Sequence, residues 1–89
     1  SPNKLNWLYS LLFMIDRLVP EMEQEQKIYF ALQKFLINIS KEENELEQFT
    51  KSANQILSAL GYTSENLSLS DIKEMFNELT NQKLPLSAI

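Results

Sequence analysis

The chain has 89 residues and a mass of 10.4 kDa, which leaves room for one compact domain. Hydrophobic residues make up 44% of it and charged residues 22%, a composition typical of a folded chain. It contains no Cys and no His, which excludes disulfides, metal sites built from thiolates or imidazoles, and catalysis by either group. Eight Lys and Arg against 12 Asp and Glu give a net charge of −4, so the overall basic footprint of a nucleic-acid-binding domain is missing.

Residues 5–19 predict the first helix. Eleven of these fifteen residues are apolar, and the segment is shorter than the roughly 20 residues that a spanning helix needs. Pro20 is expected to end the helix, and Ser1 or Asn3 to cap its start. The apolar residues form two adjacent stripes at helical spacing: Leu5, Leu8, Leu12, Ile15 and Val19 in one, and Trp7, Leu11, Met14 and Leu18 in the other.

This surplus of apolar residues leaves two alternatives open. The favoured one is that the first helix is the central and most buried helix of the domain. The other is that Trp7, Leu11 or Phe13 stays partly exposed and contacts a partner, a membrane or a second copy in a weak dimer.

The second and third helices are expected to be separate, although no Gly or Pro divides them. The pattern Ser40-Lys41-Glu42-Glu43 matches a capping box, in which Ser40 would cap the third helix. One continuous helix of about forty residues is also improbable in a domain of this size. The predicted core stripes are Ile28, Leu32, Phe35 and Ile39 in the second helix and Leu46, Phe49, Ala53, Ile56 and Leu60 in the third.

Gly61 is expected to end the third helix in a left-handed conformation, within a Schellman motif. Ser68 is the predicted cap of the fourth helix, with Asp71 at its third position. The pattern therefore predicts an all-α fold, an antiparallel up-down four-helix bundle over residues 1–82. Residues 83–89 form a short C-terminal tail, which either packs on the bundle or stays free to engage a partner.

Side chains that could carry out catalysis are poorly represented. The carboxylate pairs Glu43/Glu47 and Glu74/Glu78 each share a helix face, but acids near helix starts and on solvated faces explain them better. Neighbouring Ser and Lys residues, as at Lys51 and Ser52, point apart on a helix. No basic stripe interleaved with aromatic residues is evident. We therefore expect no enzyme, no cofactor, no metal and no nucleic-acid partner.

The order of these parts resembles that of the immunity proteins of pediocin-like bacteriocin producers, the enterocin A immunity type. The resemblance covers about residues 5–82. It rests on an apolar opening helix, an Ala-Leu-x-x-x-Leu helix at residues 31–36, the third helix at residues 46–57, and Leu-Ser-Leu-Ser-Asp-Ile at residues 67–72 leading into Met75-Phe76. The chain's tail is shorter than that of many such proteins.

The resemblance implies a cytoplasmic protein that protects a Gram-positive producer cell without chemistry. Such proteins are thought to act at the inner face of the membrane on a mannose phosphotransferase permease that has bacteriocin bound. Their specificity is associated with the C-terminal half. Carried over to this sequence, the partner-binding residues are Lys73, Asn77, Lys83, Leu84, Leu86 and Ile89. The alternative is a small helical regulator or adaptor, such as a phage-encoded inhibitor, that binds a soluble host protein.

Overall fold

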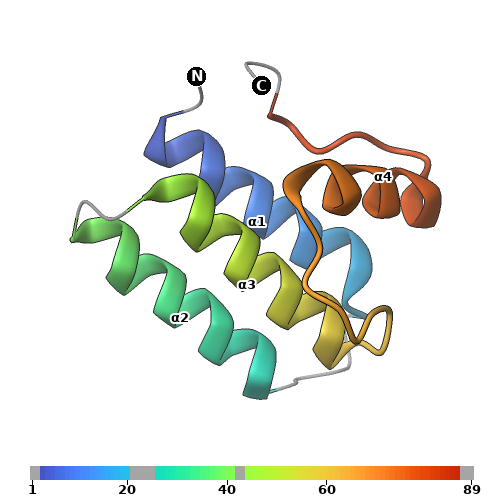
Figure 1. The fold of residues 1–89 in the computed structure, drawn as a ribbon, viewed down its shortest axis with the longest axis horizontal. Coiled ribbons are helices and arrows are strands. Elements are labelled where there is room, and N and C mark those ends of the chain that lie inside the picture. The colour runs from blue at the N-terminus through green and yellow to red at the C-terminus, as the bar shows by residue number, and fades with distance from the viewer. Residues whose placement is uncertain (1–2, 21–25, 42–43, 87–89) are drawn as a thin grey trace.

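The computed structural model describes residues 3–20, 26–41 and 44–86, and the described chain is helical without any strand. Figure 1 shows its four helices, which are α1 (Lys4–Leu18), α2 (Gln26–Ser40), α3 (Glu45–Ala59) and α4 (Leu69–Thr80). The prediction of an all-α four-helix bundle is confirmed. The predicted separation of the second and third helices is also confirmed, since α2 ends at Ser40 and α3 begins at Glu45.

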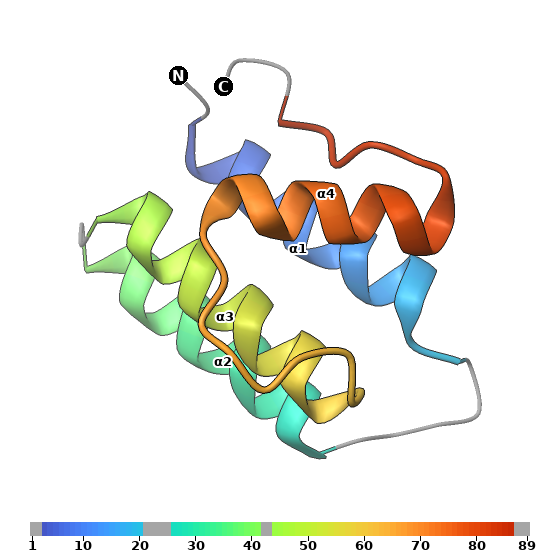
Figure 2. The same ribbon diagram turned by 45° about the vertical axis from the view of Figure 1, so that its right-hand side comes forward.

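The helix at the centre of the bundle is α3. Like α1, it packs against each of the other three helices, but its contacts are more extensive and it carries more buried residues than α1, while α4 contacts α1 and α3 but not α2. The expectation that the first helix is the central one is therefore wrong. Helices α1, α2 and α3 alternate in direction, and the connection after α3 turns back along it, so that α4 lies obliquely across α1 (Figures 1 and 2).

Local signals in the sequence set most of the helix ends. Asn3 caps α1 through a capping box with Asn6, and α1 ends directly before the Val19–Pro20 pair. Ser68 caps α4 by accepting a hydrogen bond from the Asp71 backbone N–H, as predicted.

The predicted cap of the third helix is wrong. Asn44 caps α3, and its side chain accepts from the Glu47 backbone N–H. Ser40 is the last residue of α2, and its hydroxyl donates to the Ile37 carbonyl at 2.7 Å, so it is engaged within its own helix. Glu43, the other half of the expected capping box, lies outside the described residues.

The Schellman motif at the end of α3 is confirmed. Gly61 has a φ of 83°, a left-handed conformation that residues with a Cβ rarely adopt. The Tyr62 N–H donates to the Leu57 carbonyl and the Gly61 N–H to the Ser58 carbonyl, the pair of bonds that defines the motif. This turn sends the chain back along α3 toward the start of α4 (Figure 1).

The core is built from one stripe of each helix. On α1 the buried stripe is Trp7, Leu11, Met14 and Leu18, while Leu5 and Leu12 of the other stripe are exposed. The largest fully buried side chains include Phe35 of α2, Phe49 of α3 and Phe76 of α4. The rings of Trp7 and Phe49 lie 5.0 Å apart between centroids, which joins α1 to α3.

The segment after α4 packs on the bundle instead of staying free. Leu84 and Leu86 are only 5% and 2% exposed and belong to the core. The Leu86 N–H donates to the Leu84 carbonyl, which closes a γ-turn around Pro85. The Nε of Arg17, near the end of α1, donates to the Gln82 side chain at 2.8 Å. Residues 82–86 therefore run back along α4 (Figure 2).

One buried hydroxyl has no hydrogen-bond partner. Ser10 of α1 is fully buried, and its Oγ is unpaired. Ser10→Ala is therefore expected to raise the free energy of unfolding by about 1 kcal/mol, because an unsatisfied polar group leaves the core and Ala is the better helix former. Urea denaturation measures this change in the free energy of unfolding. Ser58 is exposed, so Ser58→Ala measures how much of the gain in stability comes from helix propensity alone. If Ser10→Ala is less stable than the original chain, the prediction is contradicted.

Candidate functional site

A groove between α4 and the tail collects most of the predicted partner-binding residues. It has a volume of about 570 Å³, and its lining residues are Lys73, Glu74, Asn77, Lys83, Leu84, Pro85 and Leu86. Five of the six residues predicted from the sequence line this one groove. The sixth, Ile89, lies outside the described residues.

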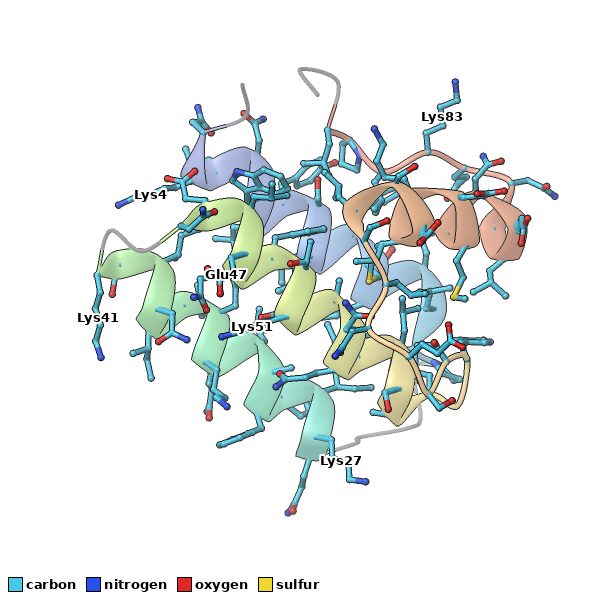
Figure 3. The ribbon with its side chains drawn as sticks, viewed as in Figure 1. Lys4, Lys27, Lys41, Glu47, Lys51 and Lys83 are labelled. Carbon is cyan, nitrogen blue, oxygen red and sulfur yellow. The ribbon has the colours of Figure 1, made fainter. Side chains whose placement is uncertain are left out.

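The accessible polar side chains of the groove stand on two elements. Lys73 and Asn77 are one helical turn apart on α4, and Lys83 projects from the tail (Figure 3). Lys83 and Asn77 are exposed and Lys73 is half-buried. Leu84 and Leu86 are buried, so the expectation that these two leucines present their side chains to a partner needs correction: they hold the tail in place and form the apolar base of the groove.

Hydrogen bonds at the end of α4 fix the position of the tail. Asn81 adopts a left-handed conformation with φ of 58°, which turns the chain back over the helix. The Asn77 side chain then donates to the Gln82 carbonyl at 3.3 Å, and the Gln82 N–H donates to the Thr80 hydroxyl at 3.1 Å. Asn77 thus helps to hold the segment that carries Lys83.

The groove combines charged and apolar side chains. It offers two ammonium groups and one carboxylate around an apolar base, and it lacks the paired nucleophile and base of covalent catalysis. Within residues 3–20, 26–41 and 44–86 no cluster of three Asp or Glu side chains is close enough to hold a metal ion. Lys51 and Ser52 do point apart: Lys51 is exposed, whereas Ser52 is buried.

A second hollow lies between α2, α3 and the connection before α4. Its volume is about 590 Å³, and its lining includes Lys27, Phe30, Lys34 and Lys51 together with the carboxylate of Glu65. The Lys34 ammonium lies 5.2 Å from the centroid of the Phe30 ring. Three lysines therefore surround a polar depression on a chain whose net charge is negative.

Asn54 fixes the wall of this second hollow. Its side chain donates to the Leu67 carbonyl at 3.0 Å and accepts from the Leu67 N–H at 2.8 Å. This pair of bonds ties the connection before α4 to the middle of α3. The asparagine acts as a structural anchor that the sequence pattern alone did not single out.

The sequence reasoning missed a basic stripe on α2. Lys27, Lys34 and Lys41 recur every seven residues, and Phe30 and Ile37 stand between them on the exposed side. Phe30 is aromatic and Ile37 is aliphatic, so this is a basic stripe interleaved with apolar side chains, one of them aromatic, and Lys41 directly follows the last residue of α2. The signal was present in the sequence as a seven-residue lysine repeat, which places side chains on nearly one line of a helix.

Apolar side chains remain exposed on α1, and of the three that the sequence indicated, Phe13 stays partly exposed. Trp7 and Leu11 are buried, and Phe13 is half-buried with its ring 5.7 Å from that of Phe76. The exposed apolar residues of α1 are Leu5, Tyr9 and Leu12.

Comparison of the chain with models of protein families, with curated proteins and with solved structures gave no match. The described helices also include none with the length and apolar character needed to cross a membrane.

Proposed function

We propose that the chain is a bacteriocin immunity protein that protects its producer by binding, without chemistry, at the inner face of the membrane. The proposed target is a mannose phosphotransferase permease that has a pediocin-like bacteriocin bound to it. The α4–tail groove is the proposed contact surface, and it operates from the cytoplasm of a Gram-positive cell. No cofactor, metal or nucleic acid takes part.

The observation that carries the proposal is the composition of this groove. The resemblance points to the C-terminal half as the partner-binding region, and the three accessible residues named from it, Lys73, Asn77 and Lys83, line this one groove. A groove whose polar groups stand on a helix and on an anchored tail suits recognition of another protein, because polar groups in fixed positions confer selectivity for a complementary surface.

The packing of the tail supports the same function. Leu84 and Leu86 anchor the tail in the core, so Lys83 is presented from a fixed position and little conformational entropy is lost when a partner binds. Specificity for one bacteriocin over another then depends on which side chains line a preformed surface. This requires no catalytic group.

The second candidate is a small helical adaptor that binds a soluble host protein. The same groove favours it, since nothing in its lining is specific to a membrane-bound partner. The two functions differ in where the partner resides, so recovery of the chain with membranes only when the permease is present supports immunity. Stable one-to-one binding to a soluble protein supports the adaptor.

A survival assay tests the proposed function. The chain is expressed in a sensitive lactic-acid bacterium, which is then challenged with a panel of pediocin-like bacteriocins. Resistance to one or two members of the panel is the expected result, because a fixed groove is selective. Unchanged sensitivity to the whole panel, with the folded protein confirmed in the cells, contradicts immunity.

A further inference from the structure

The outward side of α2 carries a regular alternation of basic and apolar side chains. This surface, called the α2 outer face, consists of Lys27, Phe30, Lys34, Ile37 and Lys41. The spacing of three and then four residues keeps all five on one side of a helix. All five are exposed, and the two apolar members, Phe30 and Ile37, retain 58% and 54% of their surface in contact with solvent.

The charge of this segment is opposite to that of the whole chain. Residues 26–41 contain three Lys and no Asp or Glu, while the full chain has a net charge of −4. Glutamates occur just before and just after the segment in the sequence, so the positive charge is confined to the helix. In Figure 3, Lys27 and Lys41 project from opposite ends of α2, away from the other helices.

The polar hollow described above continues this surface toward α3. Lys27 and Lys34 belong to both, and Lys51 adds a third ammonium group at the hollow, 3.9 Å from Glu47. The other lining groups of the hollow are mostly uncharged hydrogen-bonding side chains: Asn54, Gln55, Ser58, Ser64 and Asn66. Groups of this kind suit phosphate oxygens, which accept hydrogen bonds and carry negative charge.

The flank of the α2 outer face that lies away from the polar hollow is apolar. Tyr29 and Leu36 are 55% and 43% exposed, and α4 does not contact α2. A helix that combines lysines with exposed aromatic and aliphatic side chains matches the interfacial type, which lies in the plane of a lipid surface. Nucleic acid is favoured less, because Leu36 and Ile37 are aliphatic, so that only about half of the exposed apolar side chains described on α2, Tyr29 and Phe30, offer a ring on which a base can stack.

We propose that the α2 outer face docks on a bilayer of anionic phospholipid. Its lysines lie among the headgroup phosphates, and Phe30 and Ile37 enter the boundary between headgroups and acyl chains. This inference deepens the proposed function and rests on it for its biological meaning, since it gives the immunity protein a way to stay at the membrane while the α4–tail groove engages its partner. The lipid binding itself requires no permease.

Flotation with vesicles of pure lipid tests the proposal. The chain is expected to float with phosphatidylglycerol vesicles at low salt and to stay behind with phosphatidylcholine vesicles. It is expected to be released as salt is raised, because screening weakens attraction to the surface. Free glycerol phosphate at millimolar concentration should not displace it, since the docked surface is wider than one phosphate.

Matched variants separate the α2 outer face from net charge. Lys27→Gln/Lys34→Gln/Lys41→Gln is expected to lower the partition coefficient roughly a hundredfold, at about fivefold for each lysine. The single change Lys34→Gln should weaken binding about fivefold, whereas Lys4→Gln on the exposed side of α1 changes the net charge equally and should leave vesicle binding nearly as in the original chain. Phe30→Gln/Ile37→Gln should weaken binding at constant charge, whereas Leu5→Gln/Tyr9→Gln on α1 should not.

Several outcomes overturn the proposal. Equal binding to both kinds of vesicle does so, and so does an equal loss in Lys34→Gln and Lys4→Gln. Stronger binding to a single-stranded oligonucleotide assigns the face to nucleic acid instead, and dimers that the Phe30→Gln/Ile37→Gln variant dissociates assign it to a second copy. Vesicle binding without resistance in the survival assay removes the proposed function alone, whereas resistance without vesicle binding removes only this inference.

Discussion

Phe49→Ala is expected to lower the free energy of unfolding by about 3–5 kcal/mol. Phe49 is fully buried on α3, the helix with the most extensive contacts to the others, and its ring lies 5.0 Å from that of Trp7. Truncation therefore removes contacts at the centre of the bundle and leaves a cavity that the surrounding helices cannot fill completely. A domain of 89 residues has a total stability of roughly 5–13 kcal/mol, so this loss is a large part of it.

Urea denaturation followed by circular dichroism measures the loss. Phe49→Leu keeps an apolar side chain at the site and is expected to stay folded with a smaller loss, which keeps the comparison measurable if Phe49→Ala unfolds. Phe30→Ala removes the same atoms from a side chain that is 58% exposed, and its expected cost is within about 0.5 kcal/mol. Equal costs for Phe49→Ala and Phe30→Ala contradict the placement of Phe49 in the core.

Leu84→Ala/Leu86→Ala is expected to release the tail and to lower the free energy of unfolding by about 2–4 kcal/mol. Both leucines are buried in the core, and a buried Leu→Ala change costs about 2–5 kcal/mol. The total stays below the sum of two such costs, because the tail can detach as a unit while the remaining bundle stays folded. The groove loses one wall in the process, so resistance should fall with it.

Leu5→Ala/Leu79→Ala is the matched control, since it removes the same atoms from leucines that are 72% and 42% exposed. It should leave stability nearly unchanged. Hydrogen exchange locates the effect: the backbone amide of Leu86, which donates to the Leu84 carbonyl, should lose its protection in the double variant. Full retention of that protection with an unchanged urea midpoint shows that the tail does not depend on its leucines.

The sequence was most informative where a single residue determines local geometry. Pro20, Gly61 and Ser68 end or begin helices through their own backbone or side-chain chemistry, and the structure has each helix boundary as expected. Their effects reach only a few residues along the chain, so no knowledge of the rest of the fold was needed. The prediction that Ser40 caps the third helix was wrong because Asn and Ser are equally suitable N-cap residues, and Asn44, four residues later, caps α3.

The arrangement of the helices was harder to predict because it depends on contacts between distant segments. Both stripes of α1 have a helical period, and only packing against α3 and α4 selects Trp7 and Leu11 for burial over Leu5 and Leu12. The same selection made α3 the central helix. Sequence periodicity identifies which residues share a face, but not which neighbour covers that face.

The groove was partly predictable. Lys73 and Asn77 share a face of α4 by their spacing of four residues, so their proximity follows from the helix itself. That Lys83 joins them depends on the left-handed Asn81 and on the burial of Leu84 and Leu86, which fold the tail back. A short apolar tail gives no local sign of the direction in which it packs.

The central claim, protection through the α4–tail groove, is tested most directly by one charge reversal and its control. Lys83→Glu changes an exposed residue of the groove, and Lys4→Glu makes the same change in an exposed residue of α1 on the opposite side of the view in Figure 3. Survival of sensitive cells is measured with the bacteriocin to which the original chain gives resistance. We predict that Lys83→Glu abolishes resistance while the protein stays folded, and that Lys4→Glu retains it. Full resistance with Lys83→Glu, or equal loss in both variants, contradicts the claim.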